Sequence, residues 1–366
     1  SYAVVEVKDN SREQNALNYD AQASNWVLLP AFARKRNIVV TGQQPLLEQM
    51  AVDSKYNKYI DGQDHKLGII ASGIAFNYLM ECFPNGCPYP VLKVSQYPLP
   101  KKLIRRMTDD CEQVLVAEEG QPFIEEQVRG VMPGNAVIRG RLTGELPRTG
   151  ELNPDFLKKA LGIEIGDNYA PCEDVTPRPP ALCQGCGHRD VYTALNEVLR
   201  EYPNARVFGD IGCYTLGFLP PYKAIHSCVD MGASITMAKG AADAGQWPAV
   251  AIIGDSTFTH SGMTGLLDAI NENADITVII SDNLTTAMTG GQDSAGTNKF
   301  EAICKGLGLS EDHLKVVVPI PKNMPEITAA IRDEINYHGV SVIIPRRECM
   351  QTLQRHLKQK KAAEKK

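Results

Sequence analysis

The sequence has no apolar run approaching the roughly 18 residues that a membrane-spanning helix needs, and no apolar signal segment near its start. Ten cysteines in 366 residues are too few for a disulfide scaffold. The formal net charge of −5 gives no sign of a nucleic-acid-binding surface. We therefore expect a cytoplasmic protein with no membrane and no nucleic acid among its partners. Clustered cysteines in such a protein are expected to be metal or redox ligands.

An aspartate and an asparagine that follow two apolar runs form the most informative pattern. Residues 250–253 lead into Asp255, and residues 276–280 lead into Asn283, 28 positions after the aspartate. Parallel strands present ligand-binding residues at their carboxyl ends. A carboxylate, an amide oxygen and a carbonyl from Thr285 suit Mg²⁺, which usually binds phosphate oxygens as well. The alternative is an ordinary strand–turn–helix connection with Asp255 as its N-cap, and the position of the asparagine argues against it.

Four cysteines have a setting that suggests a shared site. Cys183 and Cys186 form a CxxC pair, while Cys213 and Cys349 each follow a strand-like run, so all four could meet at one edge of a sheet. Four thiolates suit either zinc or an iron–sulfur cluster, and a lone CxxC pair favours zinc or a redox dithiol. We expect the other cysteines to be small buried residues, with Cys304 as the second choice for the fourth ligand: Cys82, Cys87, Cys111, Cys172, Cys228 and Cys304.

Together these motifs resemble the 2-oxoacid:ferredoxin oxidoreductases, and most closely the large, thiamine-diphosphate-binding subunit of indolepyruvate:ferredoxin oxidoreductase. The usual Gly-Asp-Gly of thiamine enzymes has Ser256 as its third residue here, and the family's CxGCPHR has Gly187 in place of proline. The resemblance covers nearly the whole chain, with matches at residues 65–130, 183–189, 209–217, 230–233, 254–262, 282–290 and 346–349.

The resemblance implies an enzyme that decarboxylates a 2-oxo acid oxidatively, with an aromatic acid of the indolepyruvate type as substrate. The products would be acyl-coenzyme A and CO₂, and the electrons would pass through a 4Fe–4S cluster to ferredoxin. Thiamine diphosphate and Mg²⁺ would be bound cofactors, and coenzyme A a co-substrate. The implied partners are a pyrimidine-side domain or chain, a small gamma-type subunit and ferredoxin, in a hetero-oligomer.

Individual residues receive roles on the same basis. Asp255, Asn283 and Thr285 would bind Mg²⁺, and His188 and His260 are candidate catalytic groups that could contact the substrate carboxylate or move a proton. Each histidine could equally be a packed side chain bonded to backbone. The cluster ligands would be Cys183, Cys186, Cys213 and Cys349. The residues expected to contact thiamine diphosphate are Gly212, Asp230, Met231, Gly232, Gly254, Asp255, Ser256, Thr257, Asn283 and Met288.

Two other functions remain open. The chain could be a non-oxidative thiamine-diphosphate decarboxylase whose cysteines bind structural zinc, or a non-catalytic subunit that binds the cofactor only within a complex. The family usually carries a domain that holds the aminopyrimidine ring and a two-cluster ferredoxin module, and neither is recognisable here. We therefore expect the isolated chain not to turn over.

Short apolar strands that alternate with helical patterns predict an α/β protein with parallel sheets. The resemblance predicts a thiamine-diphosphate-binding domain preceded by a smaller α/β domain like the C-terminal domain of transketolase. Strands are expected at residues 67–71, 91–94 and 114–117, and again at 205–208, 250–253, 276–280 and 340–344. The expected divisions are a connector left from the end of a pyrimidine-side domain (1–62), the small α/β domain (63–150), a proline-rich linker (151–180), the cofactor and cluster domain (181–349) and a basic tail (350–366).

Overall fold

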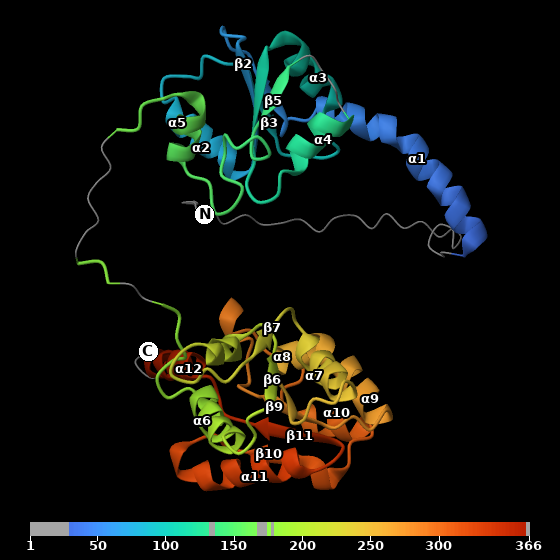
Figure 1. Cartoon of the computed structure of the whole chain (residues 1–366), viewed down its shortest axis with the longest axis vertical. Helices are drawn as coiled ribbons and strands as arrows, with labels where there is room; N and C mark the ends of the chain where they lie inside the picture. The colour runs from blue at the N-terminus through green and yellow to red at the C-terminus, as the bar shows by residue number, and fades with distance from the viewer. Residues whose placement is uncertain (1–28, 132–135, 167–173, 177–178, 364–366) are drawn as a thin grey trace. The chain divides into compact units, whose positions relative to one another are not determined.

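The structure, a computed structural model, describes residues 29–131, 136–166, 174–176 and 179–363. It divides into two compact units, unit 1 from Ser1 to Pro171 and unit 2 from Cys172 to Lys366. Each unit has one sheet with helices packed on its faces (Figure 1). The predicted α/β class with parallel sheets is therefore confirmed.

Unit 1 contains a five-stranded sheet in the order β1-β3-β2-β4-β5, with β1 antiparallel at its edge and the other strands parallel. Alternate residues of its strands point to opposite faces, so Ile69 packs with α2 and α5 whereas Ile70 packs with α3 and α4. The strands are β1 (Lys58–Ile60), β2 (Leu67–Ser72), β3 (Val91–Val94), β4 (Gln113–Ala117) and β5 (Val137–Arg139), and the helices are α2 (Ile74–Cys82), α3 (Lys101–Asp110), α4 (Phe123–Val131) and α5 (Pro154–Leu161).

Two segments of unit 1 are more regular than the sequence suggested. The expected connector contains a helix of 23 residues, α1 (Pro30–Val52), which contacts α3, and its last residues form strand β1. The expected linker contains α5, where Pro154 occupies the first turn and the Asn153 side chain accepts a hydrogen bond from the Phe156 amide at 3.0 Å. Proline is favoured at the first helical position, so this proline starts a helix instead of marking a linker. Leu157 of α5 is fully buried and completes one side of the unit 1 core.

Unit 2 contains a six-stranded parallel sheet in the order β10-β11-β9-β8-β6-β7. Helices α7, α9 and α10 pack on one face, and α6 and α11 pack on the other. The strands are β6 (Arg206–Gly209), β7 (Ser227–Cys228), β8 (Ala249–Gly254), β9 (Ile276–Ser281), β10 (Leu314–Val317) and β11 (Val340–Pro345), and the helices are α6 (Gly187–Leu199), α7 (Ala233–Asp243), α9 (Met263–Asn271), α10 (Phe300–Gly306), α11 (Met324–Asn336) and α12 (Met350–Ala363).

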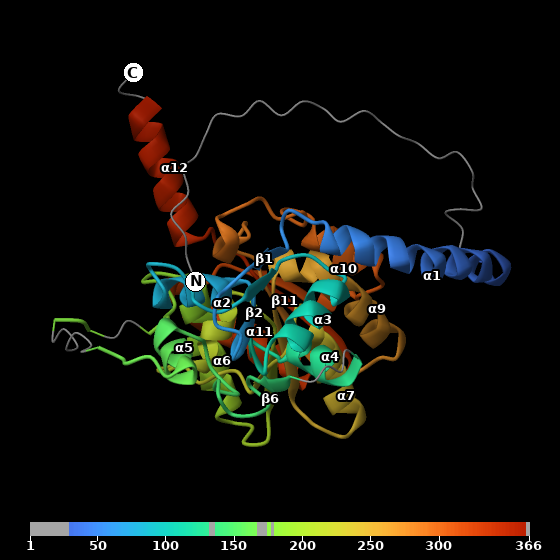
Figure 2. The same ribbon diagram turned by 90° about the horizontal axis from the view of Figure 1, so that it is seen from above.

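The strand order of unit 2 gathers its loops at the carboxyl edge of the sheet. Gly254 is paired with Ser281 across β8 and β9, and an isolated bridge joins Asp282 to Arg346 beyond the ends of β9 and β11. The expected basic tail forms α12, which projects from the sheet as a separate arm (Figure 2). Within the described ranges, none of the helices has the length and apolar character needed to cross a membrane.

Candidate functional site

The three predicted Mg²⁺ ligands lie around one turn at this edge. Asp255 lies directly after β8, and its buried carboxylate accepts hydrogen bonds from the Ser256 amide at 2.6 Å and the Thr285 amide at 3.1 Å. The side-chain oxygen of Asn283 accepts from the same Thr285 amide at 3.2 Å. A carboxylate, an amide oxygen and the Thr285 backbone are thus brought together, as the sequence predicted.

The electrostatics of this turn favour a cation. Burial first, and the neighbouring carboxylate of Asp282 as well, raise the pKa of Asp255 to about 6, against the amide hydrogen bonds that lower it. Asp282 is itself neutralised by Arg346, whose Nε lies 2.5 Å from its carboxylate, and Arg346 also pairs with both oxygens of Glu301. Arg346 thus leaves Asp255 as a buried acid that a divalent cation would hold in its ionised form.

A pocket of about 640 Å³, part of it open to solvent, lies over this turn. Its base is close to the Tyr214 ring, because a Cβ atom at Gly254 would lie 2.6 Å from that ring and one at Gly212 would lie 2.3 Å from it. Only glycine leaves the backbone free at these two places. The predicted cofactor contacts that line this pocket are Gly212, Met231, Gly254, Asp255, Ser256, Thr257, Asn283 and Met288.

Two predicted cofactor contacts lie outside the pocket. Asp230 is exposed, and the buried Gly232 donates its amide to the carboxylate of Asp210 at 3.1 Å. Asp210 also accepts from the Ser234 amide at 2.7 Å, so it binds the amino end of α7 and holds the loop before it. The sequence pattern missed Tyr214 because its place depends on two glycines far apart in the chain, Gly212 and Gly254, that both approach its ring.

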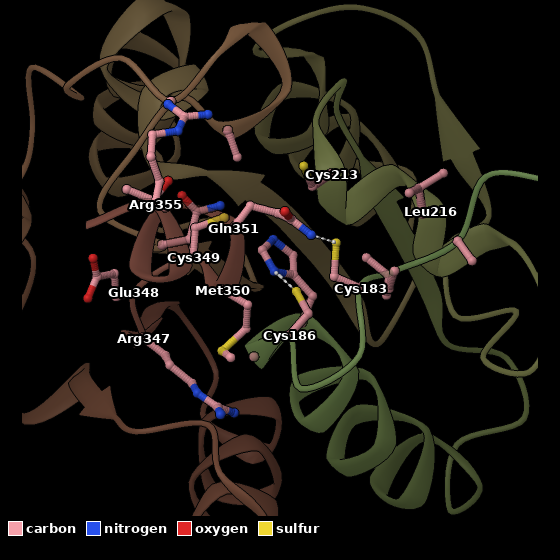
Figure 3. Close-up of a pocket in the computed structure, with 18 residues that line it drawn as sticks. Cys183, Cys186, Cys213, Leu216, Arg347, Glu348, Cys349, Met350, Gln351 and Arg355 are labelled. Carbon is pink, nitrogen blue, oxygen red and sulfur yellow. Dashed lines mark hydrogen bonds between the residues drawn. The ribbon is translucent and has the colours of Figure 1, made fainter. Parts of the chain in front are cut away.

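The four predicted cluster ligands line a second pocket, of about 700 Å³ and also partly open (Figure 3). Cys183 and Cys186 lie on a turn in which the Cys186 amide donates to the Cys183 carbonyl at 3.1 Å and Gly185 has a φ of +75°. Such a turn requires glycine at its third position, which explains the Cys-Gln-Gly-Cys spacing. This pocket shares Cys213, Asn283 and Ala287 with the first, so the two pockets adjoin.

The thiols of this second pocket affect one another. Burial first, and then the other three cysteines, raise the pKa of Cys213 to about 11. Burial also raises the pKa of Cys186, with further contributions from Cys183 and Cys349. No three His, Cys, Asp or Glu side chains among the described residues are gathered tightly enough to hold a single metal ion.

The two candidate catalytic histidines have different surroundings. His188 is buried, stacks nearly parallel to Tyr214, and has its Nδ1 atom 3.3 Å from the Cys186 sulfur. Burial lowers the pKa of His188 to about 4, so the imidazole is neutral at pH 7. His260 is exposed, its Nδ1 atom lies 3.0 Å from the Ser261 hydroxyl, and it lines neither pocket. Their catalytic roles stay predictions.

The remaining cysteines divide into three groups. Cys82, Cys111 and Cys304 are buried as expected, and Cys87 is partly buried. Cys304, on α10, is fully buried in the core of unit 2 and does not line the four-cysteine pocket. The expectation of burial is wrong for Cys228, which is exposed on the edge strand β7, and Cys172 lies outside the described residues.

Two residues of α12 also reach the site, and the expectation of a basic tail did not predict this. The Gln351 amide donates to the Cys183 sulfur at 3.6 Å, and a guanidinium nitrogen of Arg355 donates to the Gly290 carbonyl at 2.7 Å (Figure 3). Arg355 thereby holds the loop that follows Asn283. The start of the expected basic tail is thus part of the wall of the four-cysteine pocket.

Comparison with known proteins identifies relatives over almost the full chain. Residues 210–363 match the family described as "Thiamine pyrophosphate enzyme, C-terminal TPP binding domain". The indolepyruvate oxidoreductase subunit IorA of Archaeoglobus fulgidus is 33% identical over 94% of this chain and 59% of the relative. The IorA subunit of Methanothermobacter thermautotrophicus is also 33% identical, over 95% of this chain and 60% of the relative.

The similarity of this chain to solved structures is weaker than its similarity to the IorA sequences. A 2-oxoglutarate:ferredoxin oxidoreductase from Magnetococcus marinus aligns with a TM-score of 0.40 and 15% identity, over 49% of this chain and 69% of that one. The chain spans about 60% of the length of the IorA subunits that it matches. Residues 210–363 are thus similar to the C-terminal TPP-binding domain of thiamine pyrophosphate enzymes, and nearly the whole chain is similar to the IorA subunits of indolepyruvate oxidoreductase.

Proposed function

We propose that this chain is the thiamine-diphosphate-binding part of a 2-oxoacid:ferredoxin oxidoreductase, with an aromatic 2-oxo acid such as indolepyruvate as substrate. The observation that carries the proposal is the adjacency of the two pockets, one with the Asp255 turn and one with four cysteines. Only an oxidative thiamine enzyme needs an electron carrier beside its cofactor. The relatives named as indolepyruvate oxidoreductase subunits support the choice of substrate.

The residues of the first pocket are suited to bind Mg²⁺ and a diphosphate. Asp255 and Asn283 would each supply an oxygen to the ion, and Thr285 a carbonyl. Ser256 and Thr257 follow the aspartate directly and would add amide and hydroxyl donors to the phosphate oxygens. Thiamine diphosphate, when bound, supplies the carbon nucleophile and electron sink for decarboxylation. The chain's own contribution is to hold the diphosphate end.

The four cysteines suit an iron–sulfur cluster better than zinc. A zinc ion binds four thiolates at about 2.3 Å each, so its ligands stand close together. The four thiols here line one pocket without forming such a tight group. A four-iron cluster is wider than a single ion and needs its ligands farther apart. Cys183, Cys186, Cys213 and Cys349 would therefore bind the cluster that takes electrons from the adjoining pocket.

Activity is proposed for an assembly and not for the isolated chain. Coenzyme A would accept the acyl group and ferredoxin the electrons, both on the strength of the family resemblance. The pyrimidine-side domain or chain and a gamma-type subunit would complete the active site. Unit 1, with its α/β sheet, would be the domain like the C-terminal domain of transketolase. The isolated chain should not reduce a viologen dye with a 2-oxo acid and coenzyme A, and activity should appear when the partner chains are added.

Calorimetric titration with thiamine diphosphate in the presence of Mg²⁺ tests the first pocket. Asp255→Ala should abolish binding, because the ion loses its only charged ligand in this chain. Asp275→Ala is the matched control, since Asp275 directly precedes β9, the strand that Asn283 follows, and so lies at the opposite, amino end of the strands. Unchanged affinity in Asp255→Ala, or an equal loss in the control, would contradict the cofactor assignment.

Metal analysis of anaerobically purified chain tests the second pocket. Iron and acid-labile sulfide in nearly equal amounts, with a brown colour and absorbance near 400 nm, are expected. Colourless protein with one zinc per chain would instead favour the non-oxidative decarboxylase, because electrons would have no carrier beside the cofactor.

A further inference from the structure

Only one of the two ring nitrogens of His188 has a hydrogen-bond partner among the described residues. Its Nδ1 atom lies 3.3 Å from the Cys186 sulfur, and its Nε2 atom is buried with no hydrogen-bond partner among the described residues. A buried imidazole without a partner on one nitrogen is costly, so the unpaired atom calls for an explanation. His188 is also 95% buried, which removes it from direct contact with solvent.

His188 also lines a small cavity whose walls include a second unpaired group. His188, Ser281 and Asn283 line this cavity, and the Ser281 hydroxyl is also buried without a partner in the described part of the chain. The cavity has room for about one water molecule. A water held there by the Ser281 hydroxyl would donate a hydrogen bond to Nε2 and satisfy both groups.

The hydrogen bond on the Nδ1 side then has only one possible direction. A cysteine that binds iron is a thiolate and cannot donate a proton, so the imidazole must be the donor. A neutral imidazole carries one proton, and a water that donates to Nε2 keeps this proton on Nδ1. The Ser281 hydroxyl, a water, the His188 imidazole and the Cys186 sulfur would then form one chain of hydrogen bonds that orients the metal ligand Cys186.

We infer that His188 is a positioning residue that donates its Nδ1 proton to the Cys186 thiolate and thereby raises the reduction potential of the iron–sulfur cluster. Hydrogen bonds to cluster sulfurs stabilise the reduced, more negative state. This inference rests on the proposed function, because it requires the cluster. It gives His188 a role different from that of an acid or base acting on the substrate, and it assigns Ser281 to the same support.

Three substitutions of His188 separate the hydrogen bond from the bulk of the ring. Asparagine can place its amide nitrogen close to the position of Nδ1 and keeps the donor. Glutamine places its amide nearer the position of Nε2 and loses the donor to Cys186. Phenylalanine keeps the ring that stacks on Tyr214 at 6.2 Å between centroids, but has no donor. The Asn and Gln variants still decide the question if the Phe variant does not fold.

The measurement is a redox titration of the cluster in the anaerobically purified full chain, followed by electron paramagnetic resonance. We expect His188→Asn to titrate with the wild type, and His188→Gln and His188→Phe to titrate at a lower potential. Ser281→Ala should shift the potential in the same direction but by less, because the water loses its anchor. Thiamine-diphosphate affinity should stay unchanged in all four variants, since neither residue lines the pocket with Asp255.

Equal potentials in the wild type and the Gln and Phe variants would overturn the inference while leaving the proposed function intact. An equal shift in the Asn variant would also overturn it, since the change would then reflect structure and not the donated proton. An unchanged potential in Ser281→Ala would refute the argument for the protonated nitrogen. If the wild type itself binds no cluster under iron and sulfide reconstitution, the proposed function fails and this inference fails with it.

Discussion

Replacement of Asp255 by asparagine should stabilise the cofactor-free protein while it removes cofactor binding. The pKa of Asp255 rises from an ordinary 3.8 to about 6, mainly because the carboxylate is buried. A difference of this size corresponds to about 3 kcal/mol of unfavourable free energy for the ionised group at pH 8. Asparagine has no charge and avoids that cost.

The substitution also loses one hydrogen bond to a backbone amide. The two carboxylate oxygens accept from the Ser256 and Thr285 amides, and an asparagine can accept only one of these because its NH₂ group would face the other donor. An unpaired buried amide costs about 1–2 kcal/mol. The expected net gain in the free energy of unfolding at pH 8 is therefore about 1–2 kcal/mol.

The pH dependence gives the sharper test. A carboxyl group with a raised pKa in the folded state destabilises that state above about pH 6, and this penalty disappears as the pH falls through 6 toward 3.8. For a pKa of about 6 the penalty at pH 5 is roughly half of its value at pH 8. The advantage of the asparagine variant should therefore shrink by about 1.5 kcal/mol between pH 8 and pH 5.

Denaturant titrations of the wild type and the Asp255→Asn variant at both pH values, with a chelator and without cofactor, measure these differences. Adding Mg²⁺ and thiamine diphosphate at pH 8 should reverse the order of stability, because only the wild type binds and gains from the ligand. A variant that is less stable than the wild type at pH 8, or a difference in the free energy of unfolding that does not depend on pH, would refute the conclusion that the ionised, buried Asp255 destabilises the cofactor-free protein.

Three further predictions concern neighbouring residues. Cys349→Ser should remove or destabilise the cluster whereas Cys304→Ser should leave the iron content unchanged, as measured by iron and sulfide analysis; the reverse result would give the fourth ligand to the other cysteine. Arg346→Gln should lower the free energy of unfolding by roughly 3 kcal/mol, because a buried aspartate loses its partner. The control Arg332→Gln, which breaks an exposed ion pair, should cost less than about 1 kcal/mol, and equal losses would contradict the argument from burial. Gln351→Leu should lower the cluster potential slightly, and by less than loss of the His188 donor, because the amide is exposed and its bond to sulfur is long; a larger shift would contradict this order.

The strands and the two central motifs of the site could be predicted because their signals are local. Apolar runs at residues 250–253 and 276–280 became β8 and β9, and the polar residues that follow them lie at one edge of the sheet. A parallel pair needs only its order and register to bring Asp255 and Asn283 together. An apolar run that is followed directly by a candidate ligand predicts both the strand and the end of the strand at which that ligand lies.

The features that sequence reasoning missed depend on contacts between distant segments. Tyr214 matters because Gly212, which lies just before it, and Gly254, the last residue of β8, both pack against its ring. Gln351 belongs to a helix whose composition is that of a solvated tail, and its contact with Cys183 follows from how α12 leaves β11. Pro154 illustrates a different limit of sequence reasoning, because proline is common both in linkers and at the first position of a helix. Only the structure, in which α5 packs against the core, shows that Pro154 begins a helix.

The two pockets adjoin because the ladder between β9 and β11 continues past the ends of the strands. The Arg347 amide donates to the Asp282 carbonyl and the Cys349 amide to the Asn283 carbonyl, each at 3.0 Å. A predicted cluster ligand and a predicted Mg²⁺ ligand are therefore joined by one backbone hydrogen bond. Because side chains alternate along a strand, a slip of one residue in this register would turn the ligand that follows the shifted strand away from its pocket. The register of β9 against β11 thus fixes the distance between the two sites, and the proposed cluster would lie beside the proposed cofactor without any dedicated connecting element.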